Sequence, residues 1–143
     1  MPIRSFEIDH TKLLPGVYIA GIKRHKQYGT ITKFDIRFCR PNKEKITPKA
    51  IHSLEHLLAV YLSEQLGENY IDLSPMGCRT GFYLTLFGDV NPSILPDWGQ
   101  SLSWIRKQKK VPGATKKTCG SAAEHDYRGA IRALEKFIRA KSN

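Results

Sequence analysis

A histidine–glutamate–histidine motif is the part of the chain best suited to chemistry. His52, Glu55 and His56 stand within five consecutive positions. On a helix, His52 and His56 are one turn apart and share a face, so both imidazoles can reach one metal ion. Glu55 lies beside them and can transfer protons without being a ligand. The motif favours a metal site, although so short a pattern also arises by chance in helices.

A catalytic metal held by two histidines needs a third protein ligand and an open position. Cys119 is the best candidate, because it precedes a segment beginning at Ser121 that we expect to be helical. The N-terminus of a helix stabilises a thiolate, which is the form that binds metal. The alternative is that Cys119 is only a small apolar residue at the entry to that helix. His125 is a rival ligand, and we interpret it as an ordinary helical histidine.

The other two cysteines differ in their surroundings. Cys78 lies in a short loop beside Arg79, between Gly77 and Gly81. Glycines allow unusual backbone angles and the close approach of a ligand. From the residues alone, Cys78 is equally well a general acid/base or an inert loop cysteine. Cys39 ends a predicted strand with no such context, and we interpret it as structural.

Period-two alternation and β-branched residues predict the strands. Between residues 30 and 39, Phe34, Ile36 and Phe38 alternate with polar residues and should form the buried face of a strand. Strands are predicted at residues 5–9, 17–22, 30–39, 69–74 and 82–87.

Helix signals follow these strands. Thr47 and Pro48 suit the start of a helix that should run to Leu66 and stop at Gly67. Residues 92–110 are expected to be mostly helical. Ser121 and Glu124 have the spacing of a capping box, so the last helix is predicted from 121 to about 141. Its inner stripe would comprise Ala123, Tyr127, Ala130, Leu134 and Phe137. This order predicts an α+β fold, with a mainly antiparallel sheet packed against helices.

The bulk composition is that of a globular enzyme-sized domain. With 143 residues and 41% hydrophobic residues, residues 1–143 are expected to form one domain with one core. No apolar run approaches the roughly 20 residues of a membrane span, and the first residues lack the apolar region of a secretory signal. Three cysteines argue against a disulfide framework. We therefore expect a cytoplasmic protein with no membrane association.

The net charge of +10 raises the question of nucleic-acid binding. The excess lies partly in residues 23–26 and partly in residues 106–117. No helix-turn-helix, zinc-finger or RNA-binding signature accompanies it, so we interpret both patches as solvated surface and expect no nucleic-acid partner.

Several long blocks, taken together, resemble the S-ribosylhomocysteine lyases, the LuxS family. The blocks are Ser5 to His10, Phe34 to Lys43, Ile51 to Ala59, Ile71 to Tyr83, and Cys119 to Asp126. They occur in order, whereas residues 89–118 match poorly and the C-terminal tail is short for the family.

The resemblance implies a role for each matching residue. His52, His56 and Cys119 match the metal ligands, with water or substrate in the fourth place. Glu55 and Cys78 match the two general acid/base residues. The positions that match the substrate pocket are Ser5, His10, Arg37 and Asp72.

The resemblance also implies an activity and an assembly. The family cleaves S-ribosyl-L-homocysteine to L-homocysteine and 4,5-dihydroxy-2,3-pentanedione, the precursor of autoinducer-2 in quorum sensing. Its enzymes are homodimers with both active sites at the subunit interface. The metal, one divalent ion per subunit, is ferrous iron in cells, and zinc or cobalt can replace it.

Two other functions remain as alternatives. The His52–His56 motif is also the inverzincin signature, so a metallopeptidase is possible. That enzyme would use a carboxylate or histidine as third ligand, and Cys78 would have no role in it. A thiolate as third ligand favours the lyase. A basic nucleic-acid-binding module built on residues 106–117 is the other alternative, and its binding would depend on salt.

Overall fold

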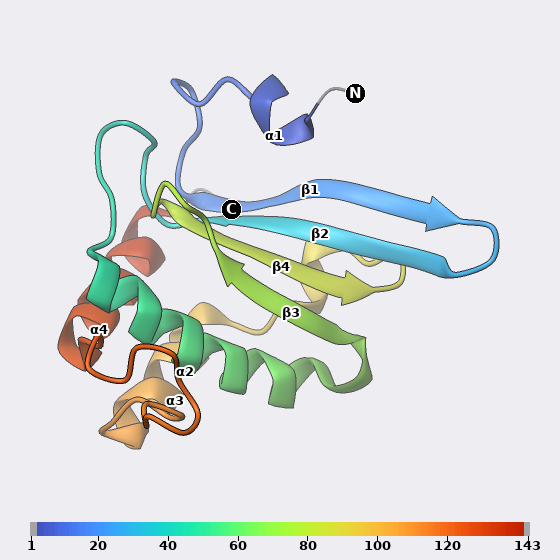
Figure 1. The fold of residues 1–143 in the computed structure, drawn as a ribbon. Coiled ribbons are helices and arrows are strands. Elements are labelled where there is room, and N and C mark those ends of the chain that lie inside the picture. Colours follow the sequence, from blue (N-terminus) through green and yellow to red (C-terminus); the bar gives the residue numbers. More distant parts are fainter. Residues whose placement is uncertain (1–2, 142–143) are drawn as a thin grey trace.

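The structure is a computed structural model that describes residues 3–141. Its centre is a four-stranded antiparallel sheet with three long helices on one face (Figure 1). The strands lie in the order β1 (Gly16–His25), β2 (Gly29–Arg37), β4 (Gly81–Phe87), β3 (Tyr70–Pro75). The long helices are α2 (Pro48–Leu66), α3 (Trp98–Gln108) and α4 (Tyr127–Ala140). The predicted α+β class with an antiparallel sheet is confirmed.

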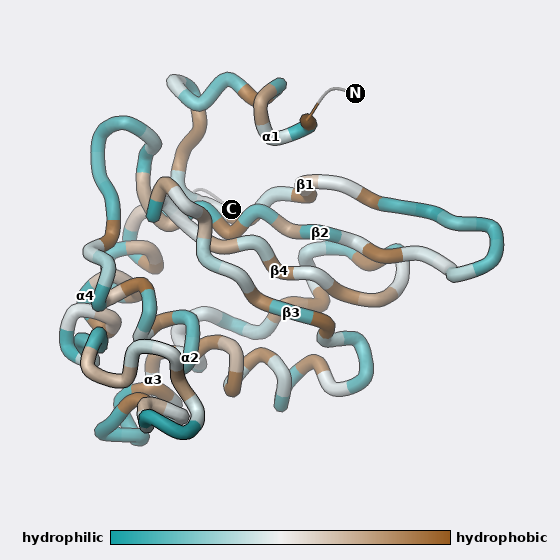
Figure 2. Tube along the Cα trace, viewed as in Figure 1, coloured by the Kyte–Doolittle hydropathy of each residue, from teal (hydrophilic) through white to brown (hydrophobic). Residues whose placement is uncertain are grey.

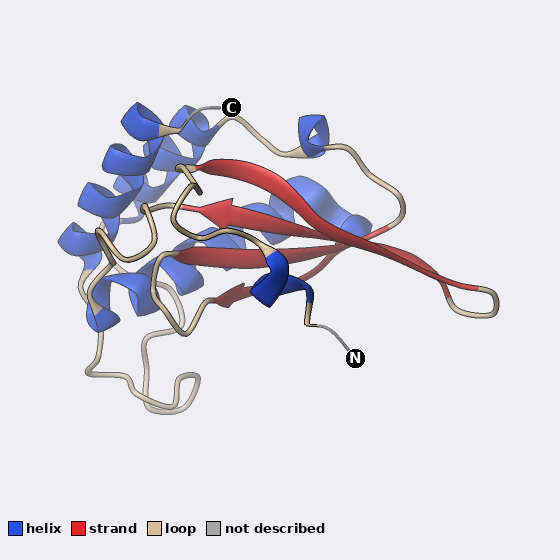
Figure 3. Cartoon of the chain, turned by 90° about the horizontal axis from the view of Figure 1, so that it is seen from above, coloured by secondary structure: helices blue, strands red, loops and turns tan. Residues whose placement is uncertain are grey.

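Different helices lie on the two faces of the sheet. Helices α2 to α4 lie below the sheet in Figure 1, and the short helix α1 (Arg4–Glu7) lies above it. Figure 3 gives the same arrangement from above, with α1 on the side of the sheet away from the long helices. We call these the helical face and the N-terminal face. The site residues are divided between them.

The hydrophobic core fills the helical face. Phe34 and Ile36 of β2 are fully buried against the leucines of α2, and Phe38 is 3% exposed. The predicted buried face of β2 is therefore confirmed. Figure 2 shows apolar positions recurring along the sheet strands and α2, while the tip of the β1–β2 hairpin is hydrophilic.

The α2 boundaries follow from their capping residues, as predicted. The hydroxyl of Thr47 accepts a hydrogen bond from the Ala50 amide at 3.3 Å, and Pro48 is the first helical residue. Gly67, with φ of 54°, ends α2 in a backbone conformation that glycine adopts at low cost. The following 3-10 turn η1 (Gly67–Asn69) leads into β3.

Two predictions of secondary structure, the strand at residues 5–9 and the start of the last helix, are wrong. Residues 5–9 contain the end of α1 and a bend rather than a strand. The expectation that residues 92–110 are mostly helical is confirmed: they form the 3-10 turn η2 (Pro92–Ile94) and, beyond Pro96, helix α3, which is capped by Asp97.

The last helix begins at Tyr127, not Ser121. Asp126 caps it by accepting the Gly129 amide at 2.8 Å, and Gly129 leaves room for that carboxylate. Ser121 and Glu124 form a backbone turn instead of a capping box, with 3.0 Å between the Glu124 nitrogen and the Ser121 oxygen. Ala123 is consequently exposed and outside the helix.

None of the helices in residues 3–141 is both long and apolar enough to cross a membrane.

Candidate metal centre and the polar network on the N-terminal face

Four side chains converge on the helical side of the molecule. The ligand atoms of His52, His56, Cys119 and His125 all lie within 4.8 Å of one another, and all four residues are half-buried. The Cys119 sulfur is 3.5 Å from Nε2 of His52. In tetrahedral sites with Zn–N of about 2.0–2.1 Å and Zn–S of about 2.3 Å, nitrogen and sulfur donors stand about 3.6 Å apart. The pair therefore has the separation that one shared cation requires.

Backbone carbonyls fix the orientation of the two α2 histidines. Nδ1 of His52 donates to the Glu124 carbonyl at 2.8 Å, and Nδ1 of His56 donates to the Pro112 carbonyl at 2.8 Å. A carbonyl only accepts, so each Nδ1 carries the proton and each Nε2 presents a lone pair. Such outer partners orient metal-binding histidines in many proteins. The donor set and its supports fit a divalent transition-metal ion.

Cys119 reaches this group from a turn rather than from a helix. Its amide donates to the Thr115 carbonyl at 2.8 Å, and α4 begins only after Asp126. The argument that a helix N-terminus stabilises the Cys119 thiolate is therefore wrong. Cys119 is positioned instead by the segment between α3 and α4, which folds back over α2.

His125 also belongs to this group and is not a helical residue. It precedes the N-cap Asp126, and its ring stacks on that of His52 with centroids 3.9 Å apart. Burial lowers the pKa of His125, and the neighbouring charges of His52 and His56 lower it further. Both effects favour the neutral form of the His125 imidazole.

Glu55 lies between the two histidines on α2, three residues after His52 and directly before His56, and is half-buried. The hydroxyl of Tyr70, at the start of β3, has its pKa raised mainly by burial and also by the charges of Asp72 and Glu55. Glu55 thus stands in the partly dehydrated space between α2 and β3. A carboxylate in such a place can exchange protons with a substrate.

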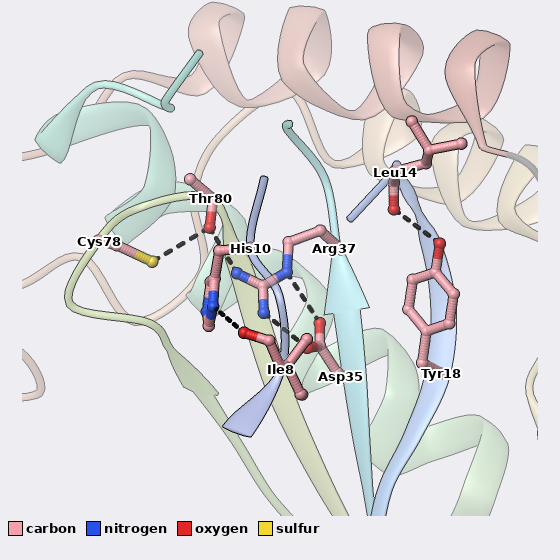
Figure 4. A network of polar contacts seen from close by, with 8 residues as sticks. All are labelled: Ile8, His10, Leu14, Tyr18, Asp35, Arg37, Cys78 and Thr80. Carbon is pink, nitrogen blue, oxygen red and sulfur yellow. Dashed lines mark hydrogen bonds and ion pairs between the residues drawn. The ribbon is translucent and has the colours of Figure 1, made fainter. Parts of the chain in front are cut away.

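A second polar group occupies the N-terminal face (Figure 4). The Arg37 guanidinium forms a bidentate ion pair with Asp35, at 3.1 and 2.6 Å, and both residues are 1% exposed. Its remaining nitrogen Nη1 donates to the Thr80 hydroxyl at 2.8 Å. The Thr80 hydroxyl is in turn 3.1 Å from the Cys78 sulfur. A continuous chain of contacts thus joins a buried ion pair to an exposed thiol.

The loop that carries Cys78 is held by close backbone packing. A side chain at Gly81 would meet the Ile36 carbonyl oxygen at 2.2 Å, so only glycine fits there. Arg79 adopts φ of 60°, and its guanidinium donates to the Ile46 carbonyl. The arginine connected to Cys78 is therefore Arg37, through Thr80.

The expected substrate residues lie mostly around this network. His10 shares with Cys78 and Thr80 a cavity of about 420 Å³, and its Nδ1 donates to the Ile8 carbonyl at 2.8 Å. Ser5 lines a neighbouring cavity of about 510 Å³. Asp72 of β3 is exposed and accepts a hydrogen bond from Ser74.

The two groups stand on opposite faces of the sheet. Along β2, Arg37 alternates with Ile36, and Ile36 packs in the core against α2. Cys78 contacts the Arg37 side through Thr80, whereas His52 and His56 belong to α2 on the helical face. The chain brings the metal donors together on the helical face and places Cys78, His10 and Arg37 near one another on the N-terminal face.

Several residues of the site escaped the sequence analysis. No sequence motif assigns a role to Asp35, Thr80 or Ser53. Pro112 and Glu124 contribute backbone carbonyls, which any residue type could supply. Residues 109–118 matched the family poorly, yet the Pro112 carbonyl orients His56. The period-two pattern of β2 was the one usable signal, because it placed Asp35 on the same face as Arg37. Cys39 is buried, which raises the pKa of its thiol to about 11, in agreement with a structural role.

Several known proteins are similar to this chain over most of its length. The chain is 48% identical to an S-ribosylhomocysteine lyase of Clostridium perfringens over 125 residues, 86% of this chain and 82% of the relative. It is 43% identical over 141 residues to the enzyme of that name from Thermus thermophilus, covering 96% of this chain and 90% of the relative. It is 42% identical over 145 residues to that of Chromohalobacter salexigens, covering 100% and 92%. A model of the S-ribosylhomocysteinase (LuxS) family matches residues 3–143, and the chain belongs to that family.

Proposed function

We propose that this protein cleaves S-ribosyl-L-homocysteine to L-homocysteine and 4,5-dihydroxy-2,3-pentanedione. The observation that carries the proposal is the convergence of His52, His56 and Cys119, with 3.5 Å between the His52 nitrogen and the sulfur. A thiol as third donor is what separates this lyase from a metallopeptidase with the same histidine motif. The family match and the names of the relatives support the same activity.

Two lone pairs on Nε2 atoms and one thiolate would hold the cation and leave a position open for substrate. When bound, the cation supplies Lewis acidity, which polarises a carbonyl and acidifies the adjacent C–H. Ferrous iron is the metal proposed for the protein in cells, with zinc or cobalt able to replace it, because the chemistry needs no change of oxidation state.

Glu55 and Cys78 are proposed as the groups that move protons. The ribose ring opens to an aldehyde at C1. Proton transfers between neighbouring carbons then move the carbonyl from C1 to C2 and from C2 to C3. Removal of the C4 proton finally expels the homocysteine thiolate from C5, and the resulting enol becomes the dione. Ring opening moves a proton between oxygens, and each later step takes a proton from carbon and returns one to carbon or oxygen, so two exchangeable acid/base groups are sufficient.

The network on the N-terminal face supports a role for Cys78. Thr80 accepts a hydrogen bond from Arg37, whose guanidinium has no acceptor. The single Thr80 proton is then available to the Cys78 sulfur 3.1 Å away. His10, Ser5, Arg37 and Asp72 are the groups proposed to bind the substrate hydroxyls around it.

A homodimer with shared active sites would unite the two groups. Cys78 and the metal donors lie on opposite faces of one chain, and in the proposed dimer a second chain brings its Cys78 to the metal of the first. Two large apolar side chains on the N-terminal side, Phe6 and Phe87, are 83% and 54% exposed and suit contact with another copy. We place the enzyme in the cytoplasm, with its dione product as the autoinducer-2 precursor.

The direct test is to incubate anaerobically purified, iron-loaded protein with S-ribosylhomocysteine and titrate the released thiol. We expect thiol to appear in proportion to substrate consumed and to stop when a chelator removes the metal. Absence of thiol release from fully metallated protein would refute the proposed activity.

A further inference from the structure

The three histidines of the metal group differ in the partner of Nδ1. For His52 and His56 the partner is a backbone carbonyl, which fixes the proton on Nδ1 and the lone pair on Nε2. For His125 the partner is the Ser53 hydroxyl, at 3.0 Å. A hydroxyl can donate as well as accept, so its other contacts decide which nitrogen of His125 carries the proton.

The Ser53 hydroxyl is fully buried, so its hydrogen-bond partners are restricted to nearby protein atoms. It accepts a hydrogen bond from the Asp126 amide at 2.8 Å. Within residues 3–141, the only other hydrogen-bond partner of this hydroxyl is Nδ1 of His125. A buried donor left without an acceptor costs free energy, because it loses its hydrogen bond to water and gains none in return. Ser53 therefore donates to Nδ1, and the His125 proton resides on Nε2.

Nε2 of His125 lies 3.6 Å from the Cys119 sulfur. We propose that His125 is not a fourth metal ligand but a positioning residue that donates an N–H···S hydrogen bond to the Cys119 thiolate. Because a protonated Nε2 has no lone pair to offer, the fourth coordination position stays open for the substrate. This inference deepens the proposed function and rests on it for the role of the open position.

The hydrogen bond also sets how strongly the sulfur donates electrons. A donor directed at a metal-binding sulfur draws electron density away from the metal, as such bonds do in other metal–thiolate sites. The cation consequently remains a better Lewis acid. Removing the His125 imidazole should leave the cation bound, with the sulfur donating more strongly to it.

Cobalt-loaded protein without substrate provides the test. In proton NMR, each imidazole bound to cobalt through Nε2 gives one strongly shifted, exchangeable Nδ1–H signal. We expect two such signals from the unaltered protein, from His52 and His56. Three signals would overturn the proposal, and this measurement needs no variant.

A pair of variants tests the hydrogen bond itself. His125→Phe should keep stoichiometric cobalt and both signals, while its sulfur-to-cobalt absorption band moves to longer wavelength. The matched control is His25→Phe, in the exposed hairpin turn, whose band should not move. An unmoved band in His125→Phe, or loss of cobalt to the extent seen with Cys119→Ala, would refute the proposal. Failure of thiol release in the unaltered enzyme would refute the lyase activity instead, leaving these spectra interpretable.

Discussion

The Thr80 hydroxyl links the Cys78 sulfur, 3.1 Å away, to the buried guanidinium of Arg37, 2.8 Å away on its other side. Because Arg37 can only donate, the Thr80 hydroxyl accepts from it and keeps its own proton available for the Cys78 sulfur. Thr80 is 3% exposed, so solvent does not compete for its proton. Thr80 thereby connects the exposed Cys78 to the buried Asp35–Arg37 ion pair through two hydrogen bonds.

Replacing Thr80 with valine should slow turnover about 10-fold, since one step of acid/base assistance is impaired rather than removed. Valine keeps the shape of threonine but supplies no proton to Cys78. Alkylation of Cys78 by iodoacetamide at neutral pH should slow in parallel, which a purely structural role for Thr80 would not produce. Thr80→Ser should recover both rates. Unchanged alkylation in Thr80→Val would contradict the relay.

Replacing Cys78 with alanine should abolish turnover, by about 10²–10⁴-fold, while the metal content stays complete. The reason is that Cys78 is proposed to move protons and lies on the face away from the metal donors. Metal analysis and thiol titration on the same preparation provide the measurement. Cys39→Ala is the control, because Cys39 is buried in the core and should affect stability alone. Near-normal turnover in Cys78→Ala would remove it from the mechanism.

Replacing Glu55 with glutamine should leave metal affinity within a few-fold of normal and reduce kcat by at least about 10²-fold. Glutamine has nearly the same size but cannot accept a proton. Glu64, on a later turn of α2, provides the control as Glu64→Gln, which should keep full activity. Loss of metal from Glu55→Gln would instead assign the carboxylate to the ligand set.

The sequence predicted those parts of the fold and site that depend on local pattern. Alternation in β2 and the caps of α2 are local, and both were confirmed. The start of α4 was missed because Ser121 and Asp126 are both suitable capping residues. In the structure Asp126 is the cap, since its carboxylate accepts the Gly129 amide. The role of His125 was missed because that error placed it inside a helix. Thr80 and Ser53 could not be found, since their partners are 43 and 72 residues away in the chain.

The Asp35–Arg37 pair should be a large single contributor to stability. Replacing Asp35 with asparagine leaves a buried guanidinium without its counter-charge, which typically costs about 3–5 kcal/mol. The free energy of unfolding, measured with urea, should fall by that order. Asp89→Asn is the control, because the Asp89–Arg24 pair is exposed and should change stability by less than about 1 kcal/mol. A loss for Asp35→Asn no larger than the control's would show that the pair is solvated.

Mixing two inactive variants tests whether the active sites are shared between chains. Cys78→Ala keeps the metal donors, and Cys119→Ala should lose the metal but keep Cys78. If each site combines the metal of one chain with Cys78 of another, a mixed dimer contains one complete site and one that lacks both functions. We expect thiol release to reappear after the two proteins are unfolded together, refolded and loaded with metal. Each variant taken alone through the same procedure is the control. Because the two groups lie on opposite faces of the sheet, a mixture that stays inactive despite forming mixed dimers would mean that both groups act within one chain, and that the sheet must rearrange to bring them together.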